Sequence, residues 1–242
     1  MSRTKENFTD IHMHVIPGVD DGASDYDEAL RMLITAEEEG IRNIIATPHS
    51  GAFDGFFNPV KKTFNKLKEM VAEECIDVNL MLGAEIYVEG QAVSKVVSGL
   101  KRGKYPTLNG TEYVLVEFDI CSEDYEDAET SVHYLTKNGY TPIIAHAEKY
   151  RFSVGQIYEL SEQGCFLQVN FSDVIPGRYE SEANEKAKRM LLDKKVDFFA
   201  TDAHNMDRRP PIITESIDYL YQNYETDYID KILYDNVKVL LS

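Results

Sequence analysis

Two histidines near the N-terminus, His12 and His14, have the spacing of a shared metal site. They lie in residues 8–16, whose apolar and β-branched residues predict a short strand. Side chains alternate along a strand, so both imidazoles face one side and could bind one divalent ion or two adjacent ions. A turn-forming run follows and adds two carboxylates, Asp20 and Asp21. The pair alone is equally consistent with two solvated surface histidines, so the rest of the chain must decide.

Imidazoles and carboxylates recur where other predicted strands end. Short apolar runs predict strands at 43–47, 78–82, 113–118, 141–145, 165–170 and 196–200. Five of the six histidines lie at strand ends, whereas surface histidines would fall mostly on helices and loops; His133, inside a predicted helix, is expected at the surface. The full set of candidate ligands is His12, His14, Asp20 or Asp21, His49, Glu85, Glu117, His146, Asp202 and His204.

Strands and amphipathic helices alternate about seven times along the chain. Helices are predicted at 25–39, capped by Ser24, and at 59–74, 123–138, 154–163, 180–192, 213–221 and 228–241. This alternation favours a parallel sheet covered by helices and closed, or nearly closed, into an α/β barrel. A doubly wound open sheet is the alternative, but polar residues at the carboxyl ends of nearly all strands fit a barrel better. With 242 residues, the chain is expected to form one domain, 1–242.

The candidate ligands define the chemistry. Imidazole and carboxylate without thiolate suit zinc, manganese or iron. About nine ligands exceed the needs of one tetrahedral ion, so two or three ions are expected, with Glu85 or Glu117 bridging neighbours. Such a cluster would polarise a phosphoryl oxygen and lower the pKa of a bridging water.

Composition excludes several other classes. A net charge of −17 disfavours nonspecific nucleic-acid binding, which requires lysines and arginines to neutralise phosphates. The sequence has no signal peptide and no apolar stretch approaching 18 residues, so a cytoplasmic, soluble protein is expected. Three widely spaced cysteines, Cys75, Cys121 and Cys165, are expected to be free buried thiols. The absence of a Cys-x5-Arg loop argues against a thiol-phosphate intermediate.

Seven motifs in order carry a family resemblance across residues 9–211. They are Asp-Ile-His-Met-His (10–14), Val-Asp-Asp-Gly (19–22), Thr-Pro-His (47–49), Gly-Ala-Glu-Ile-Tyr (83–87), Val-Glu-Phe (116–118), Ala-His-Ala-Glu-Lys-Tyr (145–150) and Thr-Asp-Ala-His-Asn (201–205). Together they resemble the polymerase-and-histidinol-phosphatase (PHP) superfamily, and within it the bacterial manganese-dependent protein-tyrosine phosphatases of capsular and exopolysaccharide clusters. The resemblance implies a distorted (βα)7 barrel, a trinuclear site holding most often manganese, and phosphotyrosine on a membrane-linked bacterial tyrosine kinase as substrate.

The resemblance also implies roles for single residues. It assigns His12, His14, Glu85 and Asp202 to one ion, His49, His146 and Glu85 to a second, and Asp20 or Asp21, Glu117 and His204 to a third. A metal-bridging hydroxide would then attack phosphorus in line, with Lys149 and Arg209 stabilising the equatorial oxygens.

The chain departs from the family at one phosphate-contacting position. The family commonly has an arginine just after the His-x-Glu motif, where this chain has Lys149, which keeps the charge but loses the bidentate fork. Arg151 is a candidate substitute, Arg209 matches a second family arginine, and Arg208 is expected to be a solvated loop charge.

Two other functions remain open from the sequence. One is a small-molecule phosphoesterase of the same superfamily, such as a histidinol-phosphatase, because substrate choice would depend on the loops at 51–57 and 101–106. The other is a non-catalytic metal-binding regulator, which the intact set of candidate ligands disfavours.

Overall fold

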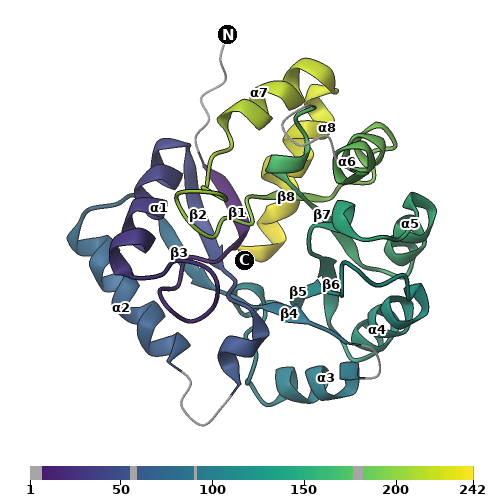
Figure 1. Cartoon of the computed structure of the whole chain (residues 1–242), viewed down its shortest axis with the longest axis horizontal. Coiled ribbons are helices and arrows are strands. Elements are labelled where there is room, and N and C mark those ends of the chain that lie inside the picture. The colour runs from purple at the N-terminus through teal and green to yellow at the C-terminus, as the bar shows by residue number, and fades with distance from the viewer. Residues whose placement is uncertain (1–6, 55–58, 90–91, 177–181, 242) are drawn as a thin grey trace.

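The strands lie in the middle of the molecule and the helices surround them (Figure 1). The computed structural model describes residues 7–54, 59–89, 92–176 and 182–241. The strands are β1 (Phe8–Met13), β2 (Ile41–Ala46), β3 (Asn79–Leu82), β4 (Glu85–Tyr87), β5 (Tyr113–Glu117), β6 (Thr141–Ile144), β7 (Phe166–Asn170) and β8 (Phe198–Ala200). The helices are α1 (Tyr26–Glu38), α2 (Val60–Glu73), α3 (Val93–Lys101), α4 (Tyr125–Lys137), α5 (Val154–Glu162), α6 (Glu182–Leu192), α7 (Thr214–Asn223) and α8 (Thr226–Asp230).

The eight strands form two parallel sheets, ordered β1-β2-β3 and β4-β5-β6-β7-β8. Because the order follows the chain in both sheets, neither has the reversal that defines a doubly wound sheet. Isolated parallel bridges join Met13 in β1 to Ala203 after β8, and His49 after β2 to Glu85 at the start of β4. The predicted α/β class is therefore confirmed, but the ladders of the described strands divide between two sheets instead of forming one closed sheet.

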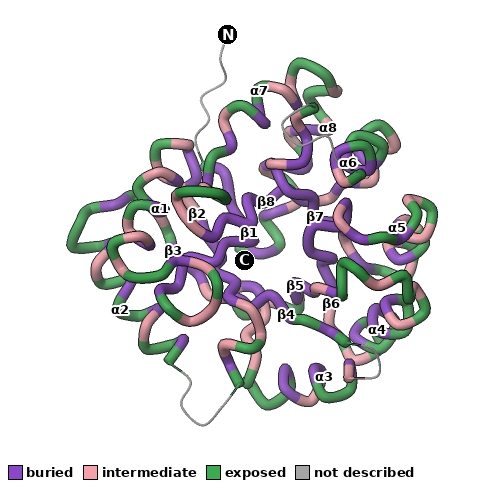
Figure 2. The backbone as a smooth tube through the Cα atoms, viewed as in Figure 1, coloured by how far each residue is buried: buried purple, intermediate pink, exposed green. Residues whose placement is uncertain are grey.

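The strands are buried on both faces, as expected for parallel strands covered by helices. All six residues of β1 are buried, and the strands form the buried centre of the tube in Figure 2, with exposure on the outer sides of the helices. Helix α1 shows the usual division: Ala29, Met32, Leu33 and Ala36 face inward at helical spacing.

Gly83 lies at the break between β3 and β4, where its backbone approaches two side chains closely. A Cβ on Gly83 would lie 2.8 Å from the side chain of Leu108 and 2.9 Å from that of Ile45, so a larger residue would displace them. After the break, the backbone N–H of Glu85 donates to Pro48 O, and Glu85 begins β4. The sequence places Glu85 beyond the end of a strand, whereas the structure makes it the first residue of a short one.

Several local predictions are wrong. The N-cap of α1 is Asp25, which accepts from the backbone N–H of Glu28, while Ser24 bonds to the side chain of Glu28. The helix predicted at 228–241 is α8 followed by an irregular helical stretch, Lys231–Asp235 and Asn236–Leu240. Residues 180 and 181 of the helix predicted at 180–192 lie outside the described residues.

The two loops expected to influence substrate choice lie against each other. Lys104 forms an ion pair with Asp54, and the hydroxyl of Tyr105 donates to the same carboxylate. Residues 55–57 of the first loop lie outside the described residues, while Ser50–Phe53 form a short 3-10 turn.

The cysteines are free, as expected, but only Cys165 is buried; Cys75 and Cys121 are exposed. His133 is exposed on α4, as predicted. Among the described helices, none is long and apolar enough to cross a membrane.

We predict that Gly22→Ala lowers the free energy of unfolding by about 1–3 kcal/mol, the usual cost of overpacking. A Cβ at Gly22 would lie 2.1 Å from the carbonyl oxygen of His14, so the turn carrying Asp20 and Asp21 would have to move. Urea denaturation measures the effect.

Gly51→Ala is the matched control, because a Cβ there meets nothing within 4 Å. Equal stability of the Gly22 variant and this control would contradict the packing of the turn against His14.

Candidate metal centre

The two histidines of the first motif converge on one point. His12 and His14 are fully buried, and their Nε2 atoms lie 3.1 Å apart. Their Nδ1 atoms are held from behind: His12 Nδ1 lies 3.1 Å from Gln168 Oε1, and His14 Nδ1 lies 2.8 Å from Asp20 Oδ2. Both rings therefore present Nε2 to the same small volume.

Glu85 lies at the centre of that volume and is almost completely buried. Its Oε1 lies 3.0 Å from His146 Nε2 and 3.3 Å from His12 Nε2. Its Oε2 lies 2.9 Å from His49 Nδ1 and 3.2 Å from His14 Nε2, yet forms no hydrogen bond. A single carboxylate thus touches imidazoles carried by β1 and by the segments that follow β1, β2 and β6.

Asp202 and His204 enter from the segment after β8. Asp202 Oδ1 lies 3.4 Å from His12 Nε2 and 3.5 Å from His204 Nδ1. The ring of His204 stacks on that of His14 with centroids 3.9 Å apart. Asp202 and His146 both have positive φ, at 52° and 34°, a region that non-glycine residues rarely adopt and that is often found at functional sites.

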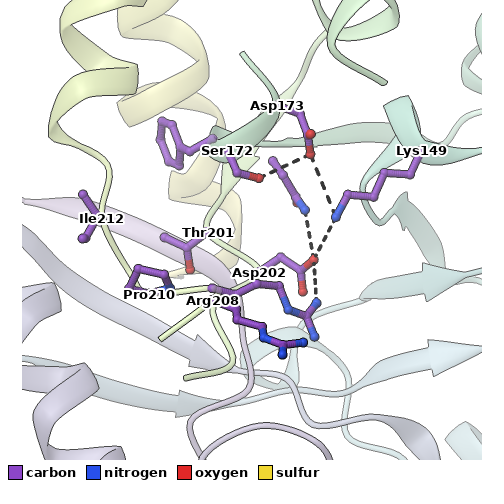
Figure 3. Close-up of a pocket in the computed structure, with 11 residues that line it drawn as sticks. Lys149, Ser172, Asp173, Thr201, Asp202, Arg208, Pro210 and Ile212 are labelled. Atoms are coloured by element: carbon purple, nitrogen blue, oxygen red, sulfur yellow. Dashed lines mark hydrogen bonds and ion pairs between the residues drawn. The ribbon is translucent and has the colours of Figure 1, made fainter. Parts of the chain in front are cut away.

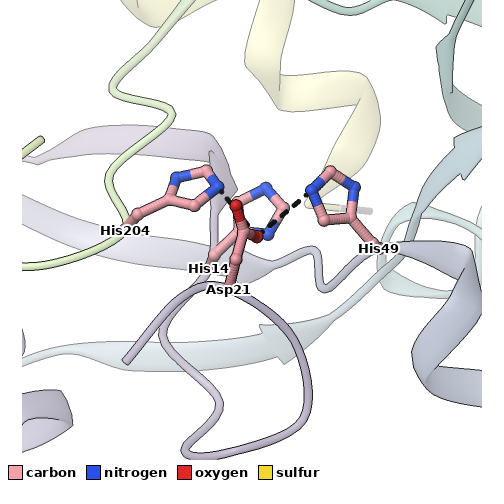
Figure 4. A group of neighbouring side chains, drawn as sticks. All are labelled: His14, Asp21, His49 and His204. Atoms are coloured by element: carbon pink, nitrogen blue, oxygen red, sulfur yellow. Dashed lines mark ion pairs between the residues drawn. The ribbon is translucent and has the colours of Figure 1, made fainter. Parts of the chain in front are cut away.

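The adjacent aspartates have different positions. Asp20 accepts from the backbone N–H groups of His49 and Gly22 as well as from His14. Asp21 Oδ1 instead lies 3.3 Å from His49 Nε2 and 3.4 Å from His204 Nε2. Figure 4 shows Asp21 between these two rings, next to His14. Asp21 therefore points into the cluster, whereas Asp20 contacts His14 Nδ1, on the side of the ring away from Glu85.

Glu117 completes the cluster at its edge. Its two oxygens lie 3.6 Å from His146 Nε2 and 3.8 Å from His49 Nδ1. Glu117 therefore groups with Glu85 and His49, whereas the family-based grouping places it with His204. Burial and the charge of Glu85 both raise the pKa of Glu117, against the opposing effect of His146 and His49.

Charge at the centre favours bound cations. Burial alone would raise the pKa of Glu85, but His12 and the other imidazoles hold it well below its usual value. Burial would lower the pKa of His14, but Asp20 and Glu85 raise it to about 10. His204 is the exception, because burial and the neighbouring His14 lower its pKa to about 3, which leaves its ring neutral.

The donor set fits divalent metal ions. The imidazoles and carboxylates fall into three groups, and the ligand atoms within each group lie within 4.8 Å of one another. The carboxylates now favour protonated imidazoles, and a metal cation could replace those protons. Glu85 Oε2, buried without a hydrogen bond, faces these rings. Three overlapping groups could each hold an ion: His12, His14 and Asp202; His49, Glu85 and Glu117; and His14, Asp21, His49 and His204.

A pocket opens beside this cluster and shares Asp202 with it (Figure 3). Asp202 Oδ2 accepts from Asn170 Nδ2 at 2.9 Å and lies 3.4 Å from Lys149 Nζ and 3.5 Å from Arg209 Nη1. Arg208 also lines the pocket, although its side chain is exposed. Phe171, Pro210 and Ile212 supply an apolar wall.

Arg151, the candidate substitute for the family arginine, lies away from this pocket. Its guanidinium is mostly exposed, lies 3.9 Å from Glu123 Oε1, and does not line the pocket. Among the described residues, Lys149 and Arg209 are the pocket cations that contact Asp202 of the cluster.

Sequence reasoning missed the polar residues of β7. Gln168 and Asn170 are buried and contact His12 and Asp202 respectively. The available signal was the alternation Gln-Val-Asn in a buried apolar strand, the same spacing as His12 and His14. It also missed Asp10, which accepts from the backbone N–H of His12 and from both the N–H and the hydroxyl of Thr201, and whose pKa burial raises to about 6.

Known proteins provide an independent comparison. The family model described as "Capsular polysaccharide synthesis, CpsB/CapC" matches residues 8–242. Tyrosine-protein phosphatase YwqE of Bacillus subtilis (strain 168) is 30% identical over 237 residues, covering 96% of this chain and 91% of that protein. Tyrosine-protein phosphatase CpsB of Streptococcus pneumoniae is 29% identical over 241 residues, covering 96% and 97%.

Solved structures agree with these relatives. A chain from the crystal structures of YwqE and CpsB, described as "unique metal-dependent tyrosine phosphatases", superposes with a TM-score of 0.84 at 29% identity, covering 96% of this chain and 94% of that chain. The phosphotriesterase homology protein from Escherichia coli matches with a TM-score of 0.64 at 13% identity, covering 97% and 98%, and so shares the fold.

We predict that divalent manganese raises the melting temperature of the chelator-treated protein. Binding to the folded state alone should add about 2.7 kcal/mol of stability when free metal exceeds its Kd a hundredfold. His146→Ala should reduce the shift, because it removes a ring that contacts both Glu85 and Glu117.

His133→Ala is the matched control, since His133 is exposed on α4. Absence of a metal-dependent shift in the unmodified protein, or the same loss in both variants, would argue against this cluster as the metal site.

Proposed function

Because the chain belongs to the CpsB/CapC family of capsular polysaccharide synthesis, we propose that it is a metal-dependent protein-tyrosine phosphatase. One structural observation carries the proposal most directly: buried imidazoles and carboxylates converge on Glu85 beside a pocket that contains Lys149 and Arg209. A phosphatase of this kind needs both parts, one to hold cations and one to hold a phosphoryl group.

The two sheets are proposed to form one distorted seven-stranded barrel within a single domain, 1–242. Residues 79–87 would act as one interrupted strand, because their first half pairs with β2 and their second half with β5. On the other side, His14 N donates to Ala203 O and Asp202 N donates to His12 O, which links β1 to the segment after β8. Closure would bring the carboxyl ends of the strands, and so the candidate ligands, around one centre.

Two or three divalent ions are proposed, with manganese preferred and zinc or iron as alternatives, as nitrogen and oxygen donors permit. The groups of neighbouring ligand atoms support His12, His14 and Asp202 for one ion, and Glu85 would contribute to this ion and to the next. The remaining assignments are His146, Glu85 and Glu117 for a second ion, and Asp21, His49 and His204 for a third. Asp21 is thus proposed as the ligand, and Asp20 as the acceptor that orients His14.

When bound, the ions would supply positive charge that polarises the phosphate ester and lowers the pKa of a nearby water. On the pocket side, Lys149 and Arg209 would bind the phosphoryl oxygens and stabilise their charge as the ester bond breaks. Lys149 offers one ammonium group, whereas an arginine would offer a planar guanidinium that donates two parallel hydrogen bonds. Lys149 therefore constrains the position of the phosphate more than its orientation. Water is the proposed nucleophile, because no cysteine belongs to the cluster or to the described lining of the pocket.

The pocket favours an aromatic phosphate ester. Phe171, Pro210 and Ile212 line the same pocket as the two cations, so a phenol ring would contact them while its phosphate contacts Lys149 and Arg209. A phenolate leaves readily, since the phenol pKa is near 10. The physiological substrate is proposed to be a phosphotyrosine-containing protein, a bacterial tyrosine kinase of capsular or exopolysaccharide synthesis, with the enzyme acting in the cytoplasm.

We expect the protein with manganese to release phosphate from a phosphotyrosyl peptide, and chelator to abolish the release. Phosphoseryl peptide and histidinol phosphate are the comparison substrates, because their leaving groups are alcohols without a phenol ring. Phosphate release measured by colorimetry decides the question. Preference for histidinol phosphate would overturn the substrate assignment while keeping the site, and no release from any substrate would overturn the activity.

Lys149→Met should lower kcat/KM for the phosphotyrosyl peptide by about 10²–10³-fold, the usual effect of removing one donor to transition-state charge. Lys149→Arg should retain most of the activity or exceed it, because the guanidinium restores the fork. Steady-state kinetics at fixed manganese measures both.

Lys188→Met, on the exposed side of α6, is the matched control and should leave the rate unchanged. Wild-type activity of Lys149→Met would exclude a phosphate-binding role for Lys149.

A further inference from the structure

Strand β7 contributes none of the candidate metal ligands, yet it places two buried amides next to them. Gln168 and Asn170 are two residues apart, so both side chains project toward the cluster from the same face of the strand. Gln168 Nε2 donates to Asn170 Oδ1 at 2.7 Å. Together they connect His12 at one end to Asp202 at the other.

One backbone group sets the direction of each hydrogen bond in the series that runs from His12 through the two amides to Asp202. The backbone N–H of His146 donates to Gln168 Oε1 at 2.9 Å, and a backbone N–H can only donate. The oxygen of the Gln168 amide is therefore fixed on that side, and its NH₂ group must face Asn170. Asn170 then accepts with Oδ1 and donates with Nδ2 to Asp202 Oδ2 at 2.9 Å.

The same logic fixes the tautomer of His12. Its Nδ1 lies 3.1 Å from Gln168 Oε1, which can only accept, so Nδ1 carries the proton. The lone pair of a neutral His12 is then on Nε2, the atom that faces His14, Glu85 and Asp202. At the other end, Asn170 holds Oδ2 of Asp202 and leaves Oδ1 toward the cluster.

We propose that Gln168 and Asn170 are positioning residues that preset two ligands of one metal ion, the tautomer of His12 and the orientation of the Asp202 carboxylate. The inference rests on the proposed metal centre and deepens it. Hydrogen bonds from residues behind the ligands commonly change metal affinity by about 10–100-fold. Here a single backbone N–H, that of His146, orients both ligands through two amides.

The tautomer can be read directly by nuclear magnetic resonance. In ¹⁵N-histidine-labelled protein loaded with Zn²⁺, which is diamagnetic, long-range ¹H–¹⁵N correlation spectra should show His12 protonated at Nδ1. The His12 signals are assigned by their loss in His12→Gln. Protonation of His12 at Nε2 would overturn the proposal without any substitution in β7.

Metal affinity tests the role of the amides. Gln168→Met keeps the length of the side chain but removes the acceptor, so the Kd for Zn²⁺ or Mn²⁺ measured by calorimetry should rise about 10–100-fold. Gln168→Glu keeps an acceptor for His12 and for the His146 N–H, so its spectrum should show His12 protonated at Nδ1, as in the wild-type protein. Asn170→Leu should weaken metal binding while leaving the His12 tautomer unchanged.

Val169→Ala is the matched control, because Val169 lies between the two amides but packs into the hydrophobic core. It should lower the melting temperature with an unchanged Kd. Unchanged metal affinity in folded Gln168→Met would overturn the inference alone, whereas a wild-type protein that binds no metal would overturn the proposed metal centre itself.

Discussion

A carboxylate buried among imidazoles is the interaction on which the rest of this structure depends. Glu85 lies within about 3 Å of rings carried on three separate segments, and a buried charge is costly unless positive partners surround it. The ends of β1, β2 and β6 must therefore meet at one point, and β4 must begin where Glu85 can reach all of them. The close approach at Gly83 and the left-handed backbone at His146 and Asp202 are local features that permit this convergence.

Asp202 connects the cluster to the pocket. One of its oxygens faces the imidazoles, while the other lies near Lys149, Arg209 and Asn170. The two cations thus offset the charge of a candidate ligand and also line the space where a phosphoryl group would bind. Burial would lower the pKa of Lys149, but Asp202 and the neighbouring acids Glu148 and Asp173 raise it, so the lysine stays charged.

The sequence predicted the parts of this site that follow from strand geometry. Parallel strands bring their carboxyl ends together, so His49, His146 and Glu117 could be grouped before any coordinates were known. It could not separate Asp20 from Asp21, because their directions depend on a turn that packs Gly22 against His14. Gln168 and Asn170 were missed because an amide side chain in a predicted buried strand does not by itself indicate a metal site.

Fold prediction had similar limits. The alternation of strands and helices was sufficient for the α/β class, and most element positions agree with the structure to within two or three residues. The N-cap of α1 was misplaced because Ser24 and Asp25 are both good caps, and only the bond to Glu28 N decides between them. The irregular C-terminal stretch, with Ile232, Leu233 and Val237 buried, has a helical pattern in sequence but not regular helical hydrogen bonding.

The central proposal is that Glu85 would hold two neighbouring metal ions, and anomalous diffraction tests it most directly. Crystals of the protein grown with manganese would be measured on both sides of the manganese absorption edge. The account predicts two or three anomalous peaks, with both oxygens of Glu85 in the coordination shells of different ions and Asp21, not Asp20, bound to one of them. No peak at Glu85, or a single ion held elsewhere, would contradict it.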